Sequence, residues 1–333
     1  MNGGLHRHLR FAALFGLALF ATGALAATAA ADGLPVLGID VGAKGVAART
    51  GSVRYVTLTA GRHTIVARTA RNGGRVLGFT RLPGNFTIPA VAYDGSASGL
   101  SADGSTLVLI QPRVVFPRAR TRFAVMDAKR VKLLERITLG GDYSFDAISP
   151  QAKTLFLIQY ISPQDPTRYR VRAYDLRARR LRARPVIDPH EREGAMRGSP
   201  ITRATSQDGR WAYTLYDGAG GTPFVHALDT SASEARCIDL PMLAGRRDLW
   251  QMRLGVEPDG SKLEVGTAKT SLALIDTSDF RVTAGERDST GHHRDRTWQI
   301  GGAAALVALL VAAGSIAGRR FRNRSGREPT YAR

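Results

Sequence analysis

Apolar and polar residues between positions 37 and 283 alternate in short runs that predict a repeating all-β structure. A tight turn that leads into a strand occurs at Ser101–Leu107, Ser149–Leu155, Ser206–Ala212 and Glu257–Leu263. A second marker, a strand that ends in aspartate, occurs at Phe123–Asp127, Val171–Asp175, Val225–Asp229 and Leu272–Asp276. Successive turns lie 48, 57 and 51 residues apart, and successive aspartates 48, 54 and 47, so the two markers advance together. Most of the turns contain Asp-Gly, which favours hairpins because their tight turns need positive φ.

These markers divide the chain into about five four-stranded units, a pattern typical of a β-propeller. The first two units are predicted as Leu37–Val41, Val53–Thr59, Thr64–Arg68 and Arg75–Arg81, then Ile88–Tyr93, Thr106–Gln111, Arg122–Asp127 and Val131–Leu139. The third is Tyr143–Ile148, Thr154–Tyr160, Arg170–Asp175 and Leu181–Val186. The last two are Ile201–Thr205, Trp211–Tyr216, Phe224–Asp229 and Ala235–Leu240, then Trp250–Val256, Lys262–Thr267, Ser271–Asp276 and Phe280–Thr283. A pair of β-sandwiches is the alternative architecture.

The S-x-D-G-x-x-L turn followed by a strand ending in aspartate resembles the blade motif of YVTN-type, TolB-like and WD40-like propellers. The resemblance covers about residues 37–283, and no unit carries the Trp-Asp or Gly-His dipeptide of WD40 proteins proper. The segments 210–218 and 224–229 also resemble uncharacterised exported proteins of high-GC actinobacteria. The resemblance implies that the tight turns lie on one face of the propeller and the longer loops on the other.

Residues 1–31 have the pattern of a secretory signal peptide. Arg7 and Arg10 precede the uncharged run Phe11–Leu25, and small residues at Ala26 and Ala31 provide cleavage positions. A basic region, an apolar stretch and a small-residue site in this order are typical of such signals. An uncleaved N-terminal anchor is the alternative, because the apolar run is at the long end of the signal-peptide range.

Residues 299–318 predict one transmembrane helix. Ile300–Ala317 contains 18 residues without a charge, and a helix of that length spans about 27 Å, close to the ~30 Å hydrocarbon core of a bilayer. The basic tail, residues 319–333, follows directly and should stay in the cytoplasm by the positive-inside rule. The prediction is a single-pass type I membrane protein in which residues 32–285 form an extracytoplasmic propeller and residues 286–298 a linker. Gly314 and Gly318 form a small-residue motif that can pair two such helices into a homodimer.

Charge narrows the class of partner. The chain has 333 residues and a formal net charge of +19, and residues 32–298 carry +12 of it. A positive domain close to a membrane favours anionic surfaces such as lipid headgroups or acidic wall polymers, and export argues against nucleic acid. Cys237 is the only cysteine, which excludes an internal disulfide and any zinc site built on several cysteines.

The candidate binding residues lie in the loops expected on the face opposite the tight turns, because loops on a rigid scaffold commonly carry function. The candidates are His190, Glu191, Arg192, Arg197, Tyr216, Asp217 and Trp250. His190 beside Asp188 and Glu191 could supply metal ligands or an acid–base pair, and a solvated polar loop is the alternative. His226, on a predicted strand, is interpreted as a hydrogen-bonded structural histidine.

The segment Arg168–Arg184 contains eight arginines and one acid. Such a stripe can bind anions, or it can protect an outer strand from edge-to-edge pairing. The function predicted from the sequence is therefore a membrane-tethered binding module for an extracytoplasmic protein or an anionic envelope polymer, with no cofactor and no metal. The alternative is a metal-dependent propeller hydrolase or lactonase with its site at the channel mouth, around His190 and Asp217.

Overall fold

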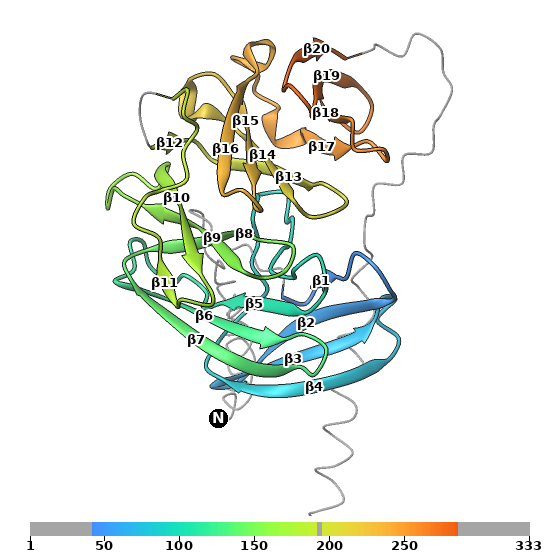
Figure 1. The fold of residues 1–333 in the computed structure, drawn as a ribbon, viewed down its shortest axis with the longest axis vertical. Coiled ribbons are helices and arrows are strands. Elements are labelled where there is room, and N and C mark those ends of the chain that lie inside the picture. Colours follow the sequence, from blue (N-terminus) through green and yellow to red (C-terminus); the bar gives the residue numbers. More distant parts are fainter. Residues whose placement is uncertain (1–41, 192–194, 286–333) are drawn as a thin grey trace, which may run out of the picture.

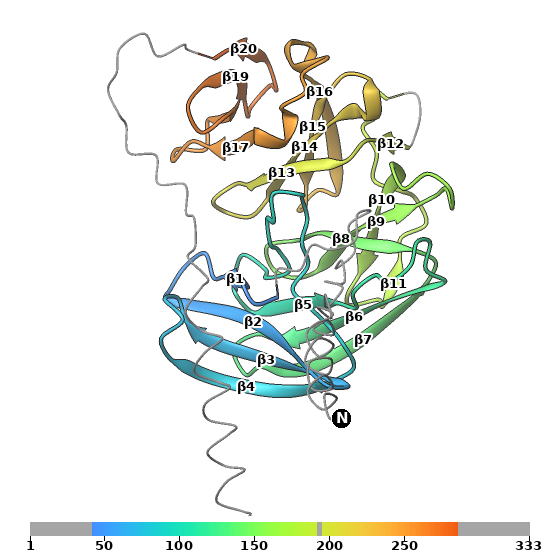
Figure 2. The ribbon, with the colours of Figure 1, turned by 180° about the vertical axis from the view of Figure 1, so that it is seen from behind.

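The computed structural model describes residues 42–191 and 195–285, in which the regular structure is β-strand apart from three short 3₁₀ segments. The strands form five antiparallel sheets that follow one another in chain order (Figures 1 and 2). Sheet one contains β1 (Val46–Ala47), β2 (Val53–Ala60), β3 (His63–Ala70) and β4 (Val76–Pro83), and sheet two contains β5 (Thr106–Ile110), β6 (Arg120–Asp127) and β7 (Lys132–Gly140). The prediction of an all-β chain with repeated four-stranded sheets is confirmed.

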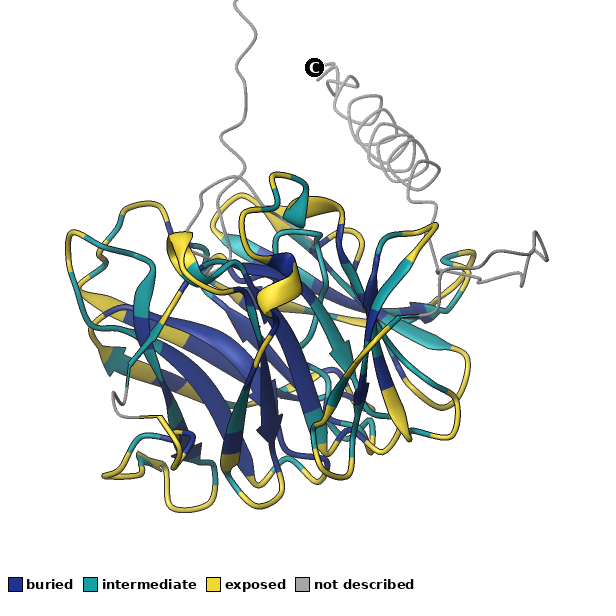
Figure 3. Ribbon diagram, turned by 90° about the horizontal axis from the view of Figure 1, so that it is seen from above, coloured by how far each residue is buried: buried dark blue, intermediate teal, exposed yellow. Residues whose placement is uncertain are grey.

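The remaining three sheets complete the described part of the chain. Sheet three contains β8 (Tyr143–Ile148), β9 (Thr154–Tyr160), β10 (Arg168–Asp175), β11 (Arg180–Leu181) and β12 (Met196–Arg197). Sheet four contains β13 (Pro200–Thr205), β14 (Trp211–Tyr216), β15 (Phe224–Asp229) and β16 (Glu234–Asp239), and sheet five β17 (Arg253–Val256), β18 (Lys262–Gly266), β19 (Ser271–Asp276) and β20 (Val282–Ala284). The 3₁₀ segments are η1 (Gly218–Gly220), η2 (Pro241–Leu243) and η3 (Leu249–Gln251). Figure 3 shows short helical turns along one side of the sheets and tight turns along the opposite side.

Both sequence markers stabilise turns through hydrogen bonds of an aspartate side chain. In the turn before β5, Asp103 Oδ1 accepts hydrogen bonds from Ser101 Oγ (2.6 Å) and the Ser105 N–H (3.0 Å). The aspartates that end strands act in the same way in the turn that follows each strand. For example, Asp229 Oδ1 accepts hydrogen bonds from the N–H groups of Ser231 (2.8 Å) and Ala232 (2.9 Å). Short polar side chains stabilise turns by such local bonds, so these aspartates recur for structural reasons.

Four apolar clusters lie between successive sheets, and each joins residues of two neighbours. Examples are Val66 with Met126 between sheets one and two, and Val225 with Val265 between sheets four and five. Buried residues of sheets two and three form a third cluster, and those of sheets three and four a fourth. Face-to-face burial of this kind is the main stabilising contribution in a sheet protein.

The predicted strand Ile88–Tyr93 is wrong. This segment makes only an isolated bridge, at Ala90, and residues 88–99 instead leave sheet two and reach the first strand of sheet four. There the N–H of Tyr93 donates to the Pro200 carbonyl (2.9 Å). Pro89 lacks the N–H that a central strand needs, which explains why the chain departs from regular pairing at this point.

Several other strands differ from the prediction by one or two residues at an end, and three differences are larger. The strand predicted to begin at Trp250 begins at Arg253, because residues 249–251 form η3. The strand predicted over Leu181–Val186 is reduced to β11 and an isolated bridge at Val186. Pro185 lies between them and has no N–H group to donate to the neighbouring strand. Arg197, which was expected in a loop, lies instead in β12, which pairs with β10.

The predicted membrane signals, linker and tail fall on residues 1–41 and 286–333, which lie outside the described residues, as does the predicted strand Leu37–Val41. Within residues 42–191 and 195–285, no helix is long and apolar enough to cross a membrane.

Candidate functional site

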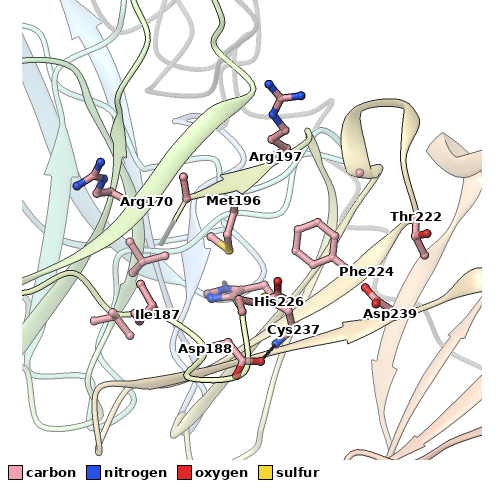
Figure 4. A pocket seen from close by; sticks show the side chains of 15 residues that line it. Arg170, Ile187, Asp188, Met196, Arg197, Thr222, Phe224, His226, Cys237 and Asp239 are labelled. Carbon is pink, nitrogen blue, oxygen red and sulfur yellow. Dashed lines mark hydrogen bonds between the residues drawn. The ribbon is translucent and has the colours of Figure 1, made fainter. Parts of the chain in front are cut away.

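The segment that follows β11 runs between sheets three and four, where it lines a pocket of about 180 Å³. One wall comes from β10, β12 and residues 186–191, and the other from β15, β16 and the loop after β14 (Figure 4). The pocket is thus a gap between two neighbouring sheets, bordered by the loop with the richest set of predicted binding residues.

Asp188 fixes this segment against sheet four. Its Oδ2 accepts a hydrogen bond from the Cys237 N–H (2.7 Å), and its Oδ1 accepts from the His190 N–H (2.9 Å). His190 Nδ1 lies 2.9 Å from the same Oδ1, and Arg236 Nη1 lies 3.6 Å from it. Burial opposes ionisation of Asp188, but these hydrogen bonds and the Arg236 charge outweigh it and hold the pKa of the carboxyl below its ordinary value. The carboxylate is therefore fully engaged by the protein.

The pocket has both apolar and polar lining residues, and the apolar ones lie on both walls. Val186, Ile187, Met196 and Phe224 line it, and Figure 4 shows the His226 imidazole among them, with Cys237 beside it on the next strand. His226 and Cys237 are direct cross-strand partners in β15 and β16, so the antiparallel register places both side chains on the same face of sheet four.

The imidazole of His226 and the thiol of Cys237 are both uncharged near neutral pH. Burial lowers the pKa of His226 to about 4 and, with the nearby acids Asp188, Glu191 and Asp239, raises the pKa of the Cys237 thiol to about 12. A thiol with such a pKa is a poor nucleophile. The wall therefore offers an imidazole and a thiol as hydrogen-bonding groups and not as reactive ones.

The structure brings some of the predicted residues to the pocket and separates the others. Glu191 and Arg197 line it, and His190 lies next to it with a side chain 65% exposed. Tyr216 is 2% exposed and packs in the cluster between sheets three and four. Trp250 is 68% exposed on η3 and does not line the pocket, and Arg192 lies outside the described residues.

Asp217 has a structural set of contacts. Its Oδ1 accepts from the N–H groups of Ser199 (2.7 Å) and Ala219 (2.9 Å), which closes the turn at η1. His190 is bonded to Asp188, so the two residues that the hydrolase alternative names each have a protein partner. Within residues 42–191 and 195–285, no three His, Cys, Asp or Glu side chains gather as a metal site requires.

Sequence reasoning missed the sheet-four half of the pocket, Phe224, His226 and Cys237. His226 was expected to be a hydrogen-bonded structural histidine, and it is 1% exposed, but no described residue makes a hydrogen bond with its side chain. The signal that could have revealed the pair was the predicted hairpin of strands 224–229 and 235–240, which places residues 226 and 237 opposite each other.

Comparison with known proteins gives a fold likeness. TolB from Acinetobacter baumannii matches with a TM-score of 0.40 and 12% identity, over 71% of this chain and 52% of that one. A putative TolB from Agrobacterium tumefaciens matches with a TM-score of 0.39 and 13% identity, over 71% and 77%. The β-propeller domain of Myceliophteria thermophila Cps50 (Swd1) matches with a TM-score of 0.41 and 9% identity, over 74% and 67%.

Two of these neighbours are named as TolB proteins and the third as a β-propeller domain. The chain spans about half the length of the first TolB chain that it matches. At such identities and TM-scores the likeness carries no conclusion about activity or partners. No family model matches the chain, and no curated protein matches it.

Proposed function

We propose that the chain is a five-bladed propeller displayed outside the cytoplasm, where it binds an anionic envelope polymer or an acidic protein surface. In this proposal residues 1–31 direct export, residues 299–318 anchor the chain, and residues 319–333 remain in the cytoplasm. The five successive sheets provide the rigid scaffold. The observation that carries the proposal is a row of exposed arginines on the outer edge of sheet three.

We call this row the basic edge. It consists of the exposed residues Arg177, Arg179, Arg180, Arg182, Arg184 and Arg197. β11 and β12 pair with opposite ends of β10, so the arginines follow one strand of eight residues, a length of about 25 Å at ~3.3 Å per residue. A linear polyanion could therefore contact several of them at once.

Few acids neutralise the basic edge. Asp175 is the one acid among residues 168–184, and its Oδ1 is taken by the N–H groups of Arg177 (2.9 Å) and Ala178 (2.8 Å). Arg179 has Glu135 at 3.6 Å, a surface contact that contributes little. Uncompensated positive charge along one edge attracts polyanions over about a Debye length, ~8–10 Å at physiological salt.

Charge reversal tests the proposal. The purified full chain would be titrated with fluorescent polyglutamate and polyphosphate at low and high salt, in wild type and in Arg177→Glu/Arg180→Glu/Arg184→Glu. Each arginine near an anionic surface contributes about 1 kcal/mol, so we expect the variant to lose at least about tenfold in affinity. Binding of polyphosphate alone would indicate a phosphate-bearing polymer, and binding of both would indicate recognition of charge.

A control with the same change in net charge separates the basic edge from overall basicity. Arg75→Glu/Arg120→Glu/Arg247→Glu alters three exposed arginines on other parts of the described chain. This variant should keep most of the wild-type affinity. Equal losses in both variants, or no binding of either polymer, would contradict the proposal.

Protease accessibility tests the topology separately. A tag placed after Arg333 should survive external protease on intact cells, while the propeller is digested. A tag digested from outside would refute the assigned orientation, and it would leave the binding experiment unaffected.

A further inference from the structure

The pocket between sheets three and four contains a buried polar group without a protein partner. His226 is 1% exposed, and its imidazole makes a ring contact with Tyr216 at 6.4 Å between centroids. No hydrogen bond to its ring nitrogens comes from residues 42–191 or 195–285. A neutral imidazole has one donor and one acceptor nitrogen, so a molecule in the pocket that can hydrogen-bond finds a partner there.

The charged groups of the pocket do not compete for this position. The guanidinium groups of Arg170 and Arg197 point away from His226 (Figure 4), and the Asp188 oxygens are occupied by Cys237 and His190. Glu191 and Asp239 are exposed. The buried part of an occupant is therefore uncharged, because a charge there would lose its hydration without gaining a partner.

The size of the pocket limits the occupant. An apolar protein cavity of about 150 Å³ holds one benzene molecule, and this pocket has about 180 Å³. A single six-membered ring with one small substituent fits that space. The ring of Phe224 and the sulfur of Met196 line the pocket and suit an aromatic occupant, since aromatic–aromatic and sulfur–aromatic contacts are both favourable.

We propose that this pocket is a binding site for a small uncharged aromatic molecule with a hydroxyl group, a phenol, whose hydroxyl bonds the His226 imidazole. The apolar ring lies between the segment 186–187 and Phe224, and the hydroxyl supplies the missing hydrogen-bond partner. This site is separate from the basic edge and does not depend on the proposed polyanion binding.

The single cysteine of the chain reports on occupancy. Cys237 lines the pocket and is the only cysteine of the chain, so a bound molecule should slow its alkylation. Because the raised pKa of the thiol makes this reaction slow, alkylation by excess iodoacetamide is followed over hours at about pH 9, by mass spectrometry on the purified full chain. Phenol and toluene are nearly the same size and differ by the hydroxyl. One neutral hydrogen bond contributes about 0.5–1.5 kcal/mol, so we expect phenol to protect Cys237 at concentrations about three- to tenfold lower than toluene.

Two matched histidine variants complete the test. His226→Phe removes the hydrogen-bonding nitrogens and keeps a ring, so phenol and toluene should then protect equally. His63→Phe, on sheet one, should retain the phenol preference. Absence of protection by either compound in wild type, equal protection by both, or a phenol preference that survives in His226→Phe would each overturn the proposal.

Discussion

The buried ion pair between Arg113 and Asp142 predicts a large loss of stability when the carboxylate is removed. Arg113 Nη2 lies 2.6 Å from Asp142 Oδ1, and the two side chains are 0% and 2% exposed. The Arg118 N–H donates to Asp142 Oδ2 at 2.9 Å, and Arg118 Nε lies 3.2 Å from Oδ1. One carboxylate therefore compensates two arginines, and these bonds hold the β5–β6 loop on the start of sheet three.

Asp142→Asn keeps the shape of the side chain and removes its charge. Breaking a buried ion pair from one side costs about 3–5 kcal/mol, because a charge is left without compensation. Burial and the neighbouring Arg113 charge already lower the pKa of Arg118 to about 10, which shows how poorly this position tolerates positive charge. We expect a loss at the upper part of that range, a large fraction of the ~5–15 kcal/mol that stabilises a typical protein.

Urea unfolding of the full chain, followed by tryptophan fluorescence and far-ultraviolet circular dichroism, measures the loss. The control is Asp279→Asn, because Asp279 pairs with Arg281 at 3.4 Å on the surface, where the arginine is 85% exposed. The control should change the midpoint little, and that small change should shrink further in 0.5 M salt. The Asp142→Asn effect should persist in salt. A loss below about 1 kcal/mol for Asp142→Asn would refute the reasoning.

Three further predictions concern backbone conformation and burial. Ala152 occupies the turn position that is glycine in the other turns, with φ of 54°, so Ala152→Gly should raise the unfolding free energy by about 0.5–1 kcal/mol in urea unfolding. Gly99 has φ of 105°, and an added Cβ would lie 2.5 Å from the Val108 carbonyl oxygen, so Gly99→Ala should cost about 2 kcal/mol or more and lower the melting temperature. The pKa of His226 is about 4 when folded and about 6.5 when unfolded, so the unfolded chain binds more protons between these values and stability should fall by about 2–3 kcal/mol from pH 7.5 to 4.5. His226→Phe should lack that part of the loss, and an unchanged pH dependence would contradict the assignment.

The sequence predicted the local parts of the fold well. Five predicted strands, 143–148, 154–160, 211–216, 224–229 and 271–276, agree with the structure at both ends. Their limits are set by turns whose bonds join residues two to five positions apart, as where Ser206 Oγ accepts from the Trp211 N–H at 2.8 Å. Because the bonded residues are so close in the chain, they form a recognisable sequence motif, and the motif repeats with each sheet.

The parts that depend on distant residues were not predictable in the same way. The segment 88–99 alternates like a strand, but its partner is the Pro200 carbonyl on sheet four, about a hundred residues later. The pocket has the same origin, because β10 and β12 approach β15 and β16 only after sheets three and four pack together. The pattern of apolar and polar residues in one segment does not indicate which distant segment will pair or pack with it.

The number of arginines in the sequence likewise does not show which of them bond within the fold and which remain exposed. Several arginines link different sheets. Arg136 Nη2 donates to the Pro83 carbonyl (2.8 Å) and Arg68 Nη1 to the Lys129 carbonyl (2.6 Å), both between sheets one and two, and Arg49 Nη1 donates to the Ser206 carbonyl (2.6 Å), between sheets one and four. A planar fork of donors suits this role better than the single ammonium of lysine. Part of the net charge therefore serves the fold, and overall basicity is a weak guide to partners. The exposed row on sheet three, where Asp175 is already used by its own turn, is the part of that charge on which the proposed polyanion binding rests.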